Sequence, residues 1–339
     1  MVHAVKTIDS HAAGQPLRLV VEGFPRPLGA TIARKQEWMA RHAEPLRLAL
    51  LREPRGHADM TAAVLTEPVL PGSHAGVLFM HPGGYTAMCG HGVIAVATIA
   101  IERGLVFDAA ADMSDEVTLV LDTAAGSIRV RAWMVSHGAG RRVDRVAFTN
   151  VPSFVVTGGH PVRVGHRELR VDIAFGGGFY VIIDAESVGL AVDADALPGL
   201  RRITADLKAG MSASVALAHP ADSQKAELEG VIFTGLPRDP AADLRSVTIY
   251  SDLAVDRSPG GTATAAVMAV LDAMGLLPPD RPFVHESLIG TLFRGQVVRR
   301  TEVGGVPAIV PEIEGSAWIT GEHTFLNDDH DPLREGFRI

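Results

Sequence analysis

Two stretches of the chain are apolar at nearly every position, a pattern typical of buried helices. Residues 92–103 and 263–274 consist mostly of Ala, Val and other apolar residues and lack the polar side that a surface helix carries. A glycine follows each stretch, Gly104 and Gly275, at the place where a left-handed residue ends a helix. We therefore predict two helices, each enclosed by the other elements of its domain.

Shorter apolar runs surround these two stretches and predict strands. Residues 18–22, 170–174 and 297–303 are rich in β-branched residues and are bounded by turn-forming residues. The sequence holds 35 glycines and 21 prolines, which fits many short strands joined by tight turns. The predicted fold class is α+β, with each domain a sheet wrapped around its central apolar helix.

The two helical stretches occur in the same context, which indicates an internal repeat. Residues 77–80 precede the first helix and residues 248–251 precede the second, at a spacing of 171 positions. Cys89 and Gly260 at the helix starts, and the two terminating glycines, have the same spacing. Three features at one offset, near half the chain length, predict two pseudo-symmetric domains that arose by duplication.

The repeat divides the chain into two domains. The first is expected over residues 1–150 and contains the helix that starts at Cys89. The second is expected over residues 151–320 and contains the helix start at residues 260–262. The tail, from about residue 320 to 339, is expected to return to the first domain.

Composition and charge narrow the class of function. The 339 residues are 47% hydrophobic and 21% charged, which is ordinary for a globular protein. The net charge of −8 argues against a nucleic-acid partner. Because no apolar run approaches the roughly 20 residues that span a bilayer, we expect no membrane partner and a cytoplasmic location. A single cysteine excludes an internal disulfide, and no spacing matches a standard metal motif, so we predict no metal site.

The starts of both predicted helices are suited to binding a small anion. The first turn of a helix has unpaired N–H groups and a partial positive charge. Gly90 and Gly92 at the first start, and Gly260, Gly261 and Thr262 at the second, are small enough to let a ligand approach the backbone. The phosphate-binding pattern with its lysine is missing, so a small amino or hydroxy acid fits better than a nucleotide. If a pseudo-twofold axis relates the halves, both starts face one cleft and share one anion.

Cys89 lies where the helix dipole favours a thiolate over a thiol. The dipole contributes about 0.3–2 kcal/mol, which is roughly one pKa unit. This suits a general base that removes a proton from a carbon next to a carboxylate. A free cysteine can also be a small buried hydrophobe. The surrounding glycines and the equivalent loop at residues 260–262, in the second half of the repeat, favour the catalytic role. A nucleophile paired with His91 is disfavoured, because two residues on one helical turn seldom reach each other in a productive line.

Motifs along the whole chain resemble the proline racemase family, which also holds 4-hydroxyproline epimerases and trans-3-hydroxy-L-proline dehydratases. Residues 88–91, Met-Cys-Gly-His, and 256–262, Asp-Arg-Ser-Pro-Gly-Gly-Thr, resemble its two signatures. Further stretches that resemble the family are residues 9–16, 53–60, 175–180 and 331–337. The resemblance implies the diaminopimelate-epimerase-like fold, a reaction without a cofactor, and two domains closing on a proline-type ligand. It leaves a homodimer open.

The resemblance also implies roles for single residues. Cys89 matches the first catalytic cysteine of the family. Gly90 and His91 match the backbone donors to the ligand carboxylate on one side. Gly261 and Thr262 match those on the other side.

The side chains of His91 and Asp256 match the groups that hold the ring nitrogen in the family. A carboxylate that faces a secondary ammonium is physically sensible in a closed, dry cleft. The alternative for Asp256 is an ordinary cap at a helix entry.

At Gly260 the sequence departs from the family, whose racemases and epimerases carry a second cysteine there and whose dehydratases carry a threonine. Inversion at carbon needs a second proton donor on the opposite face, and glycine provides none. In trans-3-hydroxy-L-proline the C2 hydrogen and the hydroxyl share one face, so one group can remove the proton and help water leave. We therefore predict dehydration to Δ1-pyrroline-2-carboxylate, with Cys89 as the single acid–base group. A 4-hydroxyproline 2-epimerase or proline racemase is the alternative, and a non-catalytic binding protein for proline-like ligands is a second one.

Overall fold

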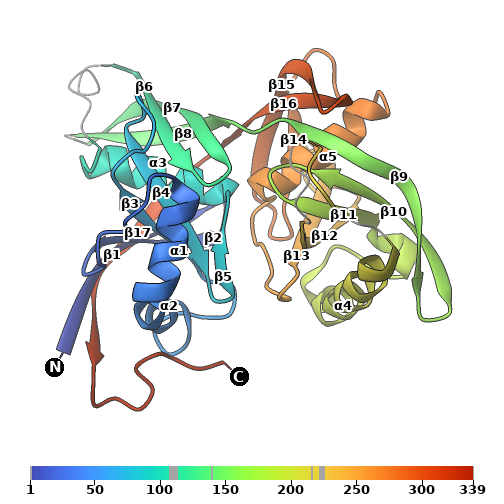
Figure 1. Cartoon of the computed structure of the whole chain (residues 1–339). Coiled ribbons are helices and arrows are strands. Elements are labelled where there is room, and N and C mark those ends of the chain that lie inside the picture. Colours follow the sequence, from blue (N-terminus) through green and yellow to red (C-terminus); the bar gives the residue numbers. More distant parts are fainter. Residues whose placement is uncertain (1, 107–113, 139, 215–216, 221–225, 339) are drawn as a thin grey trace. The chain divides into compact units, whose positions relative to one another are not determined.

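The chain forms two compact units in the computed structural model (Figure 1). Unit 1 consists of Met1–Phe148 and Gly315–Ile339, and unit 2 of Thr149–Glu314. The structure describes residues 2–106, 114–138, 140–214, 217–220 and 226–338. The division after Phe148 lies beside the predicted one at residue 150, and the C-terminal segment is part of unit 1.

In the sheet of unit 1, the C-terminal strand β17 forms one edge and pairs with the N-terminal strand β1. Strand β17 pairs with β1 over eleven residues, from Val2 opposite Asp328 to Ala12 opposite Ala317. Neighbouring strands are antiparallel, except for the parallel pairs β2–β3 and β4–β6. The order in space is β17 (Ala317–Asp328), β1 (Val2–Ala12), β2 (Gln15–Glu22), β3 (Thr61–Thr66), β4 (Ala75–His81), β6 (Glu116–Thr123), β7 (Gly126–His137) and β8 (Gly140–Thr149), with the short β5 (Gly84–Thr86) paired to β4.

Unit 2 repeats this succession of pairings with its own strands. The parallel pairs are β11–β12 and β13–β14, at the places that β2–β3 and β4–β6 hold in unit 1. Strand β16 also pairs back to β9, through Ala308 opposite Phe154, so the sheet closes on itself. The order is β9 (Ser153–Val164), β10 (Arg167–Phe175), β11 (Phe179–Asp184), β12 (Leu228–Gly235), β13 (Leu244–Tyr250), β14 (Phe283–Glu286), β15 (Leu292–Val303) and β16 (Val306–Gly315).

A buried helix lies against the inner face of each sheet, as the sequence predicts. Helix α3 (Gly90–Glu102) contacts β1, β2, β3, β7 and β17, and helix α5 (Gly261–Ala273) contacts β9, β10, β11 and β15. Figure 1 shows both helices among their strands. Gly104 and Gly275, with φ of 61° and 69°, follow the last turns in the predicted left-handed conformation. The two helices of the repeat are therefore confirmed, with starts two residues earlier than their apolar runs.

Further helices, which the sequence patterns do not predict, cover the outer faces. They are α1 (Ile32–His42), α2 (Glu44–Leu51) and α4 (Leu197–Ser214), with short 3-10 turns at Ala185–Val188 and Ala194–Ala196. Because each has an exposed side, a search for uniformly apolar stretches passes over them. None of the helices in the described part of the chain is both long enough and apolar enough to cross a membrane.

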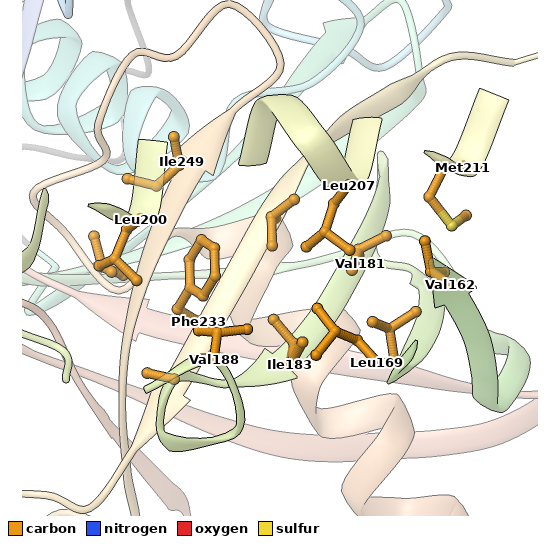
Figure 2. Packing of buried hydrophobic residues seen from close by; sticks show 14 of the residues in the cluster. Val162, Leu169, Val181, Ile183, Val188, Leu200, Leu207, Met211, Phe233 and Ile249 are labelled. Atoms are coloured by element: carbon orange, nitrogen blue, oxygen red, sulfur yellow. The ribbon is translucent and has the colours of Figure 1, made fainter. Parts of the chain in front are cut away.

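The outer layer of unit 2 is a packed apolar cluster between α4 and the sheet (Figure 2). Leu200 and Leu207 of α4 pack in one cluster with Val181 of β11 and Phe233 of β12. Each of these four residues is 0% exposed, so these two leucines of α4 are completely buried against the sheet. Because α4 covers the outer face and α5 the inner face, the central strands of this sheet are buried on both faces.

Strand β4 shows the same two-sided burial in unit 1 and leads directly into the first helix start. Leu78 and Met80 belong to the cluster that includes Met39 of α1 and Leu50 of α2. Phe79, between them, points the other way and lies beside Gly92 of α3. A strand covered on both faces is apolar at every position, which is why residues 77–80 carry no polar alternation.

Candidate active site

Cys89 occupies the N-cap of α3 and defines half-site 1, with Gly90 and His91 in the first helical turn. Its backbone is extended, with φ of −143° and ψ of 103°, and its carbonyl accepts the N–H of Val93 at 2.8 Å. Cys89 is 8% exposed, and His91 is 3% exposed. A thiol at the positive end of an enclosed helix is stabilised as thiolate by the peptide dipoles.

The thiol of Cys89 contacts the imidazole of His91. Sγ lies 3.5 Å from Nδ1 and 3.4 Å from Nε2, and both side chains are buried. The two side chains therefore touch, but the sulfur is almost equally far from both ring nitrogens and so lies over the ring, not in line with either nitrogen. The contact arises because the extended N-cap directs the side chain of Cys89 over the first turn instead of away from it.

Gly92 is required by packing within half-site 1. A Cβ at this position would lie 2.7 Å from Cε1 of Phe79 and 2.8 Å from Sγ of Cys89. Both contacts are shorter than real carbon atoms allow, so a side chain here would displace the thiol. Gly92 therefore makes room for Cys89; close approach of a ligand to the backbone at Gly92 stays a prediction.

Gly260 occupies the N-cap of α5 and defines half-site 2, with Asp256 before it and Gly261 and Thr262 after it. Its backbone has φ of 74° and ψ of 124°, a combination open to glycine and unfavourable for other residues. A Cβ would lie 2.9 Å from Cβ of Ala263 and 3.2 Å from Oδ2 of Asp256. The two N-caps, equivalent in the repeat, thus differ in backbone conformation as well as in side chain.

Asp256 is fully buried and orders the loop that enters α5. Its Oδ1 accepts the backbone N–H of Ser258 at 2.9 Å and the Ser258 hydroxyl at 2.7 Å. Its Oδ2 accepts the hydroxyl of Tyr250 at 2.8 Å, and the N–H of Gly260 donates to Oγ of Ser258 at 3.1 Å. Asp256 therefore shapes the approach to the helix without being its N-cap; a contact with a ligand nitrogen stays a prediction.

Thr262 is anchored by its side chain. Its hydroxyl lies 2.7 Å from the hydroxyl of Tyr180 on β11, and both residues are buried. The role predicted for Thr262 in carboxylate binding therefore rests on its backbone N–H.

The structure brings the six site residues together in two groups, Cys89 with Gly90 and His91, and Asp256 with Gly261 and Thr262. Within the described ranges, no group of three or more His, Cys, Asp or Glu side chains could hold a metal ion. A contact of both groups with one ligand remains part of the proposal below.

The partners that hold half-site 2 are not identified from the sequence. The spacing of Asp256 and Ser258 is that of a local side-chain turn, which could have indicated the first pair. Tyr180 gives no such local signal, because it lies on β11 and meets Thr262 only where β11 contacts α5. Tyr250 is close to Asp256 in sequence but forms no turn pattern with it that a motif would reveal.

Comparison with known proteins places these features in a family. A family model described as proline racemase matches residues 7–338. A trans-3-hydroxy-L-proline dehydratase of Bacillus cereus is 39% identical over 333 residues, which is 98% of this chain and 97% of that protein. A 3-hydroxyproline 2-epimerase of Burkholderia multivorans is 39% identical over 337 residues, 99% of this chain and 98% of that one.

Among solved structures, a hydroxyproline epimerase of Agrobacterium vitis with bound trans-4-hydroxy-L-proline is similar over 99% of this chain and 95% of that one. The TM-score is 0.88 at 28% identity. This likeness confirms the predicted fold class, an α+β fold of the diaminopimelate-epimerase-like type with two similar domains. A named dehydratase and a named epimerase are equally close in sequence, so identity alone does not select the reaction. The match of nearly the whole chain shows that the protein belongs to the proline racemase family.

Proposed function

We propose that this protein dehydrates trans-3-hydroxy-L-proline to Δ1-pyrroline-2-carboxylate, with Cys89 as its single acid–base group. The observation that carries the proposal is Gly260 at the start of α5, in a sequence with one cysteine. The N-cap of α3 carries a thiol and the equivalent N-cap of α5 has no side chain at all. Such a pair suits a reaction that needs one proton-transferring group on one face of the ring.

In the proposed reaction the thiolate of Cys89 removes the C2 proton, and the electron pair is delocalised toward the carboxylate. The new thiol then protonates the 3-hydroxyl on the same face, the C3–O bond breaks, and water leaves. The enamine product tautomerises to the pyrroline. The backbone N–H groups of Gly90, His91, Gly261 and Thr262 would bind the carboxylate, where charge grows in the transition state.

The side chains of Asp256 and His91 would hold the ring nitrogen as an ammonium. The imidazole of His91 also contacts Sγ of Cys89, the atom that takes up the proton in the proposed reaction. We propose no cofactor, metal, nucleic acid or membrane partner. A cytoplasmic location and a homodimer remain open expectations from the sequence.

One observation favours the alternative, an epimerase or racemase. The position of a Cβ at Gly260 is 3.2 Å from Oδ2 of Asp256, so a carboxyl group lies where the second cysteine of an epimerase would project. A proton delivered by Asp256, directly or through a water, would allow inversion. A protein that binds proline-like ligands without turnover is the second alternative.

The deciding experiment is incubation in D2O with trans-3-hydroxy-L-proline and, separately, trans-4-hydroxy-L-proline, followed by NMR. Conversion of the 3-hydroxy compound to a pyrroline, with the 4-hydroxy compound keeping its C2 configuration, supports the dehydratase. Formation of the C2 epimer of the 4-hydroxy compound would show that another group replaces the missing cysteine. Binding of both without conversion or deuterium uptake would leave only the binding protein.

A further inference from the structure

A buried chain of side chains ends at the carbonyl of Gly260. His285 on β14 is fully buried, with Nε2 2.8 Å from Oγ of Ser246 on β13. Its Nδ1 lies 2.9 Å from Oγ1 of Thr264 on α5. The same Oγ1 lies 2.5 Å from the carbonyl oxygen of Gly260 and 3.5 Å from that of Pro259. Strands β13 and β14 are thus connected through Thr264 to the N-cap of α5.

Counting protons fixes the direction of each hydrogen bond. A carbonyl can only accept, so the single hydroxyl proton of Thr264 is donated to Gly260, and Oγ1 must accept from His285. Nδ1 of His285 therefore carries its proton. Because burial lowers the pKa of His285 to about 3, the ring is neutral and Nε2 accepts from Ser246. The chain runs in one direction, from Ser246 through His285 and Thr264 to Gly260.

The Gly260 carbonyl determines where the next N–H points. It accepts two hydrogen bonds from Thr264, one from the backbone N–H at 2.8 Å and one from the hydroxyl. In a planar trans peptide the C=O and the following N–H point in opposite directions. A carbonyl held along the helix axis therefore directs the N–H of Gly261 outward from the helix start. That N–H is one of the proposed donors to the ligand carboxylate.

Gly260, whose carbonyl accepts these hydrogen bonds, is a residue with unusual backbone freedom. Gly260 has no side chain to restrict its dihedral angles, and its φ of 74° lies outside the usual range. In unit 1 the equivalents of Thr264 and Ser246, at the spacing of 171, are Val93 and Ala75, which have no hydroxyl. There the N-cap is Cys89 in an ordinary extended conformation. The hydrogen-bonded chain belongs to the half-site whose N-cap is glycine.

A threonine bonded to the carbonyl four residues earlier is by itself common. Thr98 and Thr204 make this bond in α3 and α4, at 2.9 and 3.0 Å. Thr264 differs because a buried histidine also lies within hydrogen-bond distance of its hydroxyl. The histidine occupies the acceptor side of that hydroxyl and leaves its proton only the carbonyl acceptors.

We infer that His285 is a positioning residue that acts through Thr264 to hold the Gly260 carbonyl and thereby aims the Gly261 N–H at the carboxylate of the ligand. The identity of the ligand rests on the proposed function. The role itself concerns binding of a carboxylate to half-site 2 and requires no turnover.

The test compares Thr264→Val and His285→Phe with two controls. Thr264→Ser keeps the hydroxyl, and Thr204→Val removes the same kind of bond at a buried threonine of α4, the outer helix of unit 2. Calorimetry with trans-4-hydroxy-L-proline gives affinity without dehydration, and turnover of trans-3-hydroxy-L-proline gives KM and kcat. We expect Thr264→Val and His285→Phe to weaken affinity and raise KM about tenfold, the change that loss of one hydrogen bond to a charged group produces.

The kcat should fall by a smaller factor than KM rises, because the carboxylate is bound in the ground state as well as in the transition state. Both controls should stay within about twofold of the parent, a range well below the effect of one such bond.

Unchanged affinity in Thr264→Val, accompanied by a lower melting temperature, would overturn the inference and make the chain purely structural. If His285→Phe does not fold, the Val and Ser variants at Thr264 decide the question between them. A parent protein that binds trans-4-hydroxy-L-proline but does not dehydrate the 3-hydroxy compound contradicts the proposed function, while the affinity series still tests the inference. If the parent binds neither compound, both are wrong.

Discussion

At the scale of single residues, the proposed chemistry depends on two positions that are equivalent in the internal repeat. Cys89 has an extended backbone and a thiol in contact with His91. Gly260 has a backbone conformation that suits glycine and a neighbouring carboxylate at the place where a side chain would start. The difference between the half-sites is therefore built into the main chain, and a single substitution does not interchange them.

Replacing Cys89 by serine should abolish most turnover. A hydroxyl is a far weaker base than a thiolate, so we expect kcat for trans-3-hydroxy-L-proline to fall by at least about 10²–10⁴-fold, the range that one general acid–base group supplies. Affinity for trans-4-hydroxy-L-proline, measured by calorimetry, should remain within about threefold, because the backbone donors are kept. A fully active Cys89→Ala variant would refute the mechanism.

Replacing Gly260 should destabilise the protein without creating an epimerase. For Gly260→Ala we expect a loss of about 2–4 kcal/mol in the free energy of unfolding, from the positive φ and the contact with Ala263. Gly275→Ala is the matched control, since Gly275 also has positive φ and open space around it, and should lose only about 1–2 kcal/mol. Urea unfolding measures both. Gly260→Cys should not epimerise trans-4-hydroxy-L-proline by chiral chromatography; efficient epimerisation would show that this N-cap accepts a side chain.

At the scale of elements, each half-site joins a strand of the sheet to the start of the buried helix. In unit 2 the helix is also tied to β13 and β14 through Thr264, Ser246 and His285. A neutral histidine in the middle of this connection makes the packing of α5 sensitive to acid, because protonation would place a charge in a dry interior.

The free energy of unfolding should therefore contain a contribution from His285 below neutral pH. Its pKa is lowered by burial to about 3 in the folded state, against about 6.5 when unfolded. Between these values the unfolded chain binds the extra proton, so this stability is complete above about pH 6.5 and is lost toward pH 3 at about 1.4 kcal/mol per pH unit. Wild type should lose about 2 kcal/mol more than His285→Phe between pH 6.5 and 5 in urea unfolding. Parallel curves for the two proteins would contradict the assignment.

At the scale of the whole molecule, the C-terminal strand pairs with the N-terminal strand. The C-terminal strand β17 pairs with β1 and completes unit 1, whereas β9 fills the same place in unit 2 (Figure 1). Arg18 links β1 and β17 of unit 1 through its contacts with Asp9 and Phe325. It bonds Asp9 at 2.8 Å and the carbonyls of Leu50 and Arg55 at 2.6 Å each, and its guanidinium lies 4.1 Å from the ring centre of Phe325.

Replacing Arg18 by methionine should cost about 3–5 kcal/mol of unfolding free energy, because it leaves Asp9 without its cation and two carbonyls without their donor. Arg300→Met is the control. Its ion pair with Asp272 has an arginine side chain that is 70% exposed, and its loss should cost less than about 1 kcal/mol. Denaturant unfolding of the two variants provides the measurement, and equal losses would show that the buried position of Arg18 has no special weight.

Much of this protein could be predicted from the sequence. The buried helices, their glycine ends, the repeat and the α+β class follow from local patterns of apolar residues, because a helix without a polar side has to be enclosed. The family followed from its two signatures. The role predicted for Cys89 drew on its position at a helix start, and that of Gly260 on the family resemblance together with the single cysteine; the reaction drawn from them stays a prediction.

Tertiary structure alone decided how the half-sites are held. The contact of Cys89 with His91, the requirement for Gly92 beside Phe79, the hydrogen bonds of Asp256 and the connection from His285 to Gly260 depend on directions and distances that no motif encodes. Cys89 and His91 are neighbours in sequence, yet their contact depends on the backbone of the N-cap, whereas His285 and Thr264 meet only because β14 lies beside α5. Local periodicity determines which residues are buried, whereas strand register and backbone dihedral angles determine which buried atoms touch.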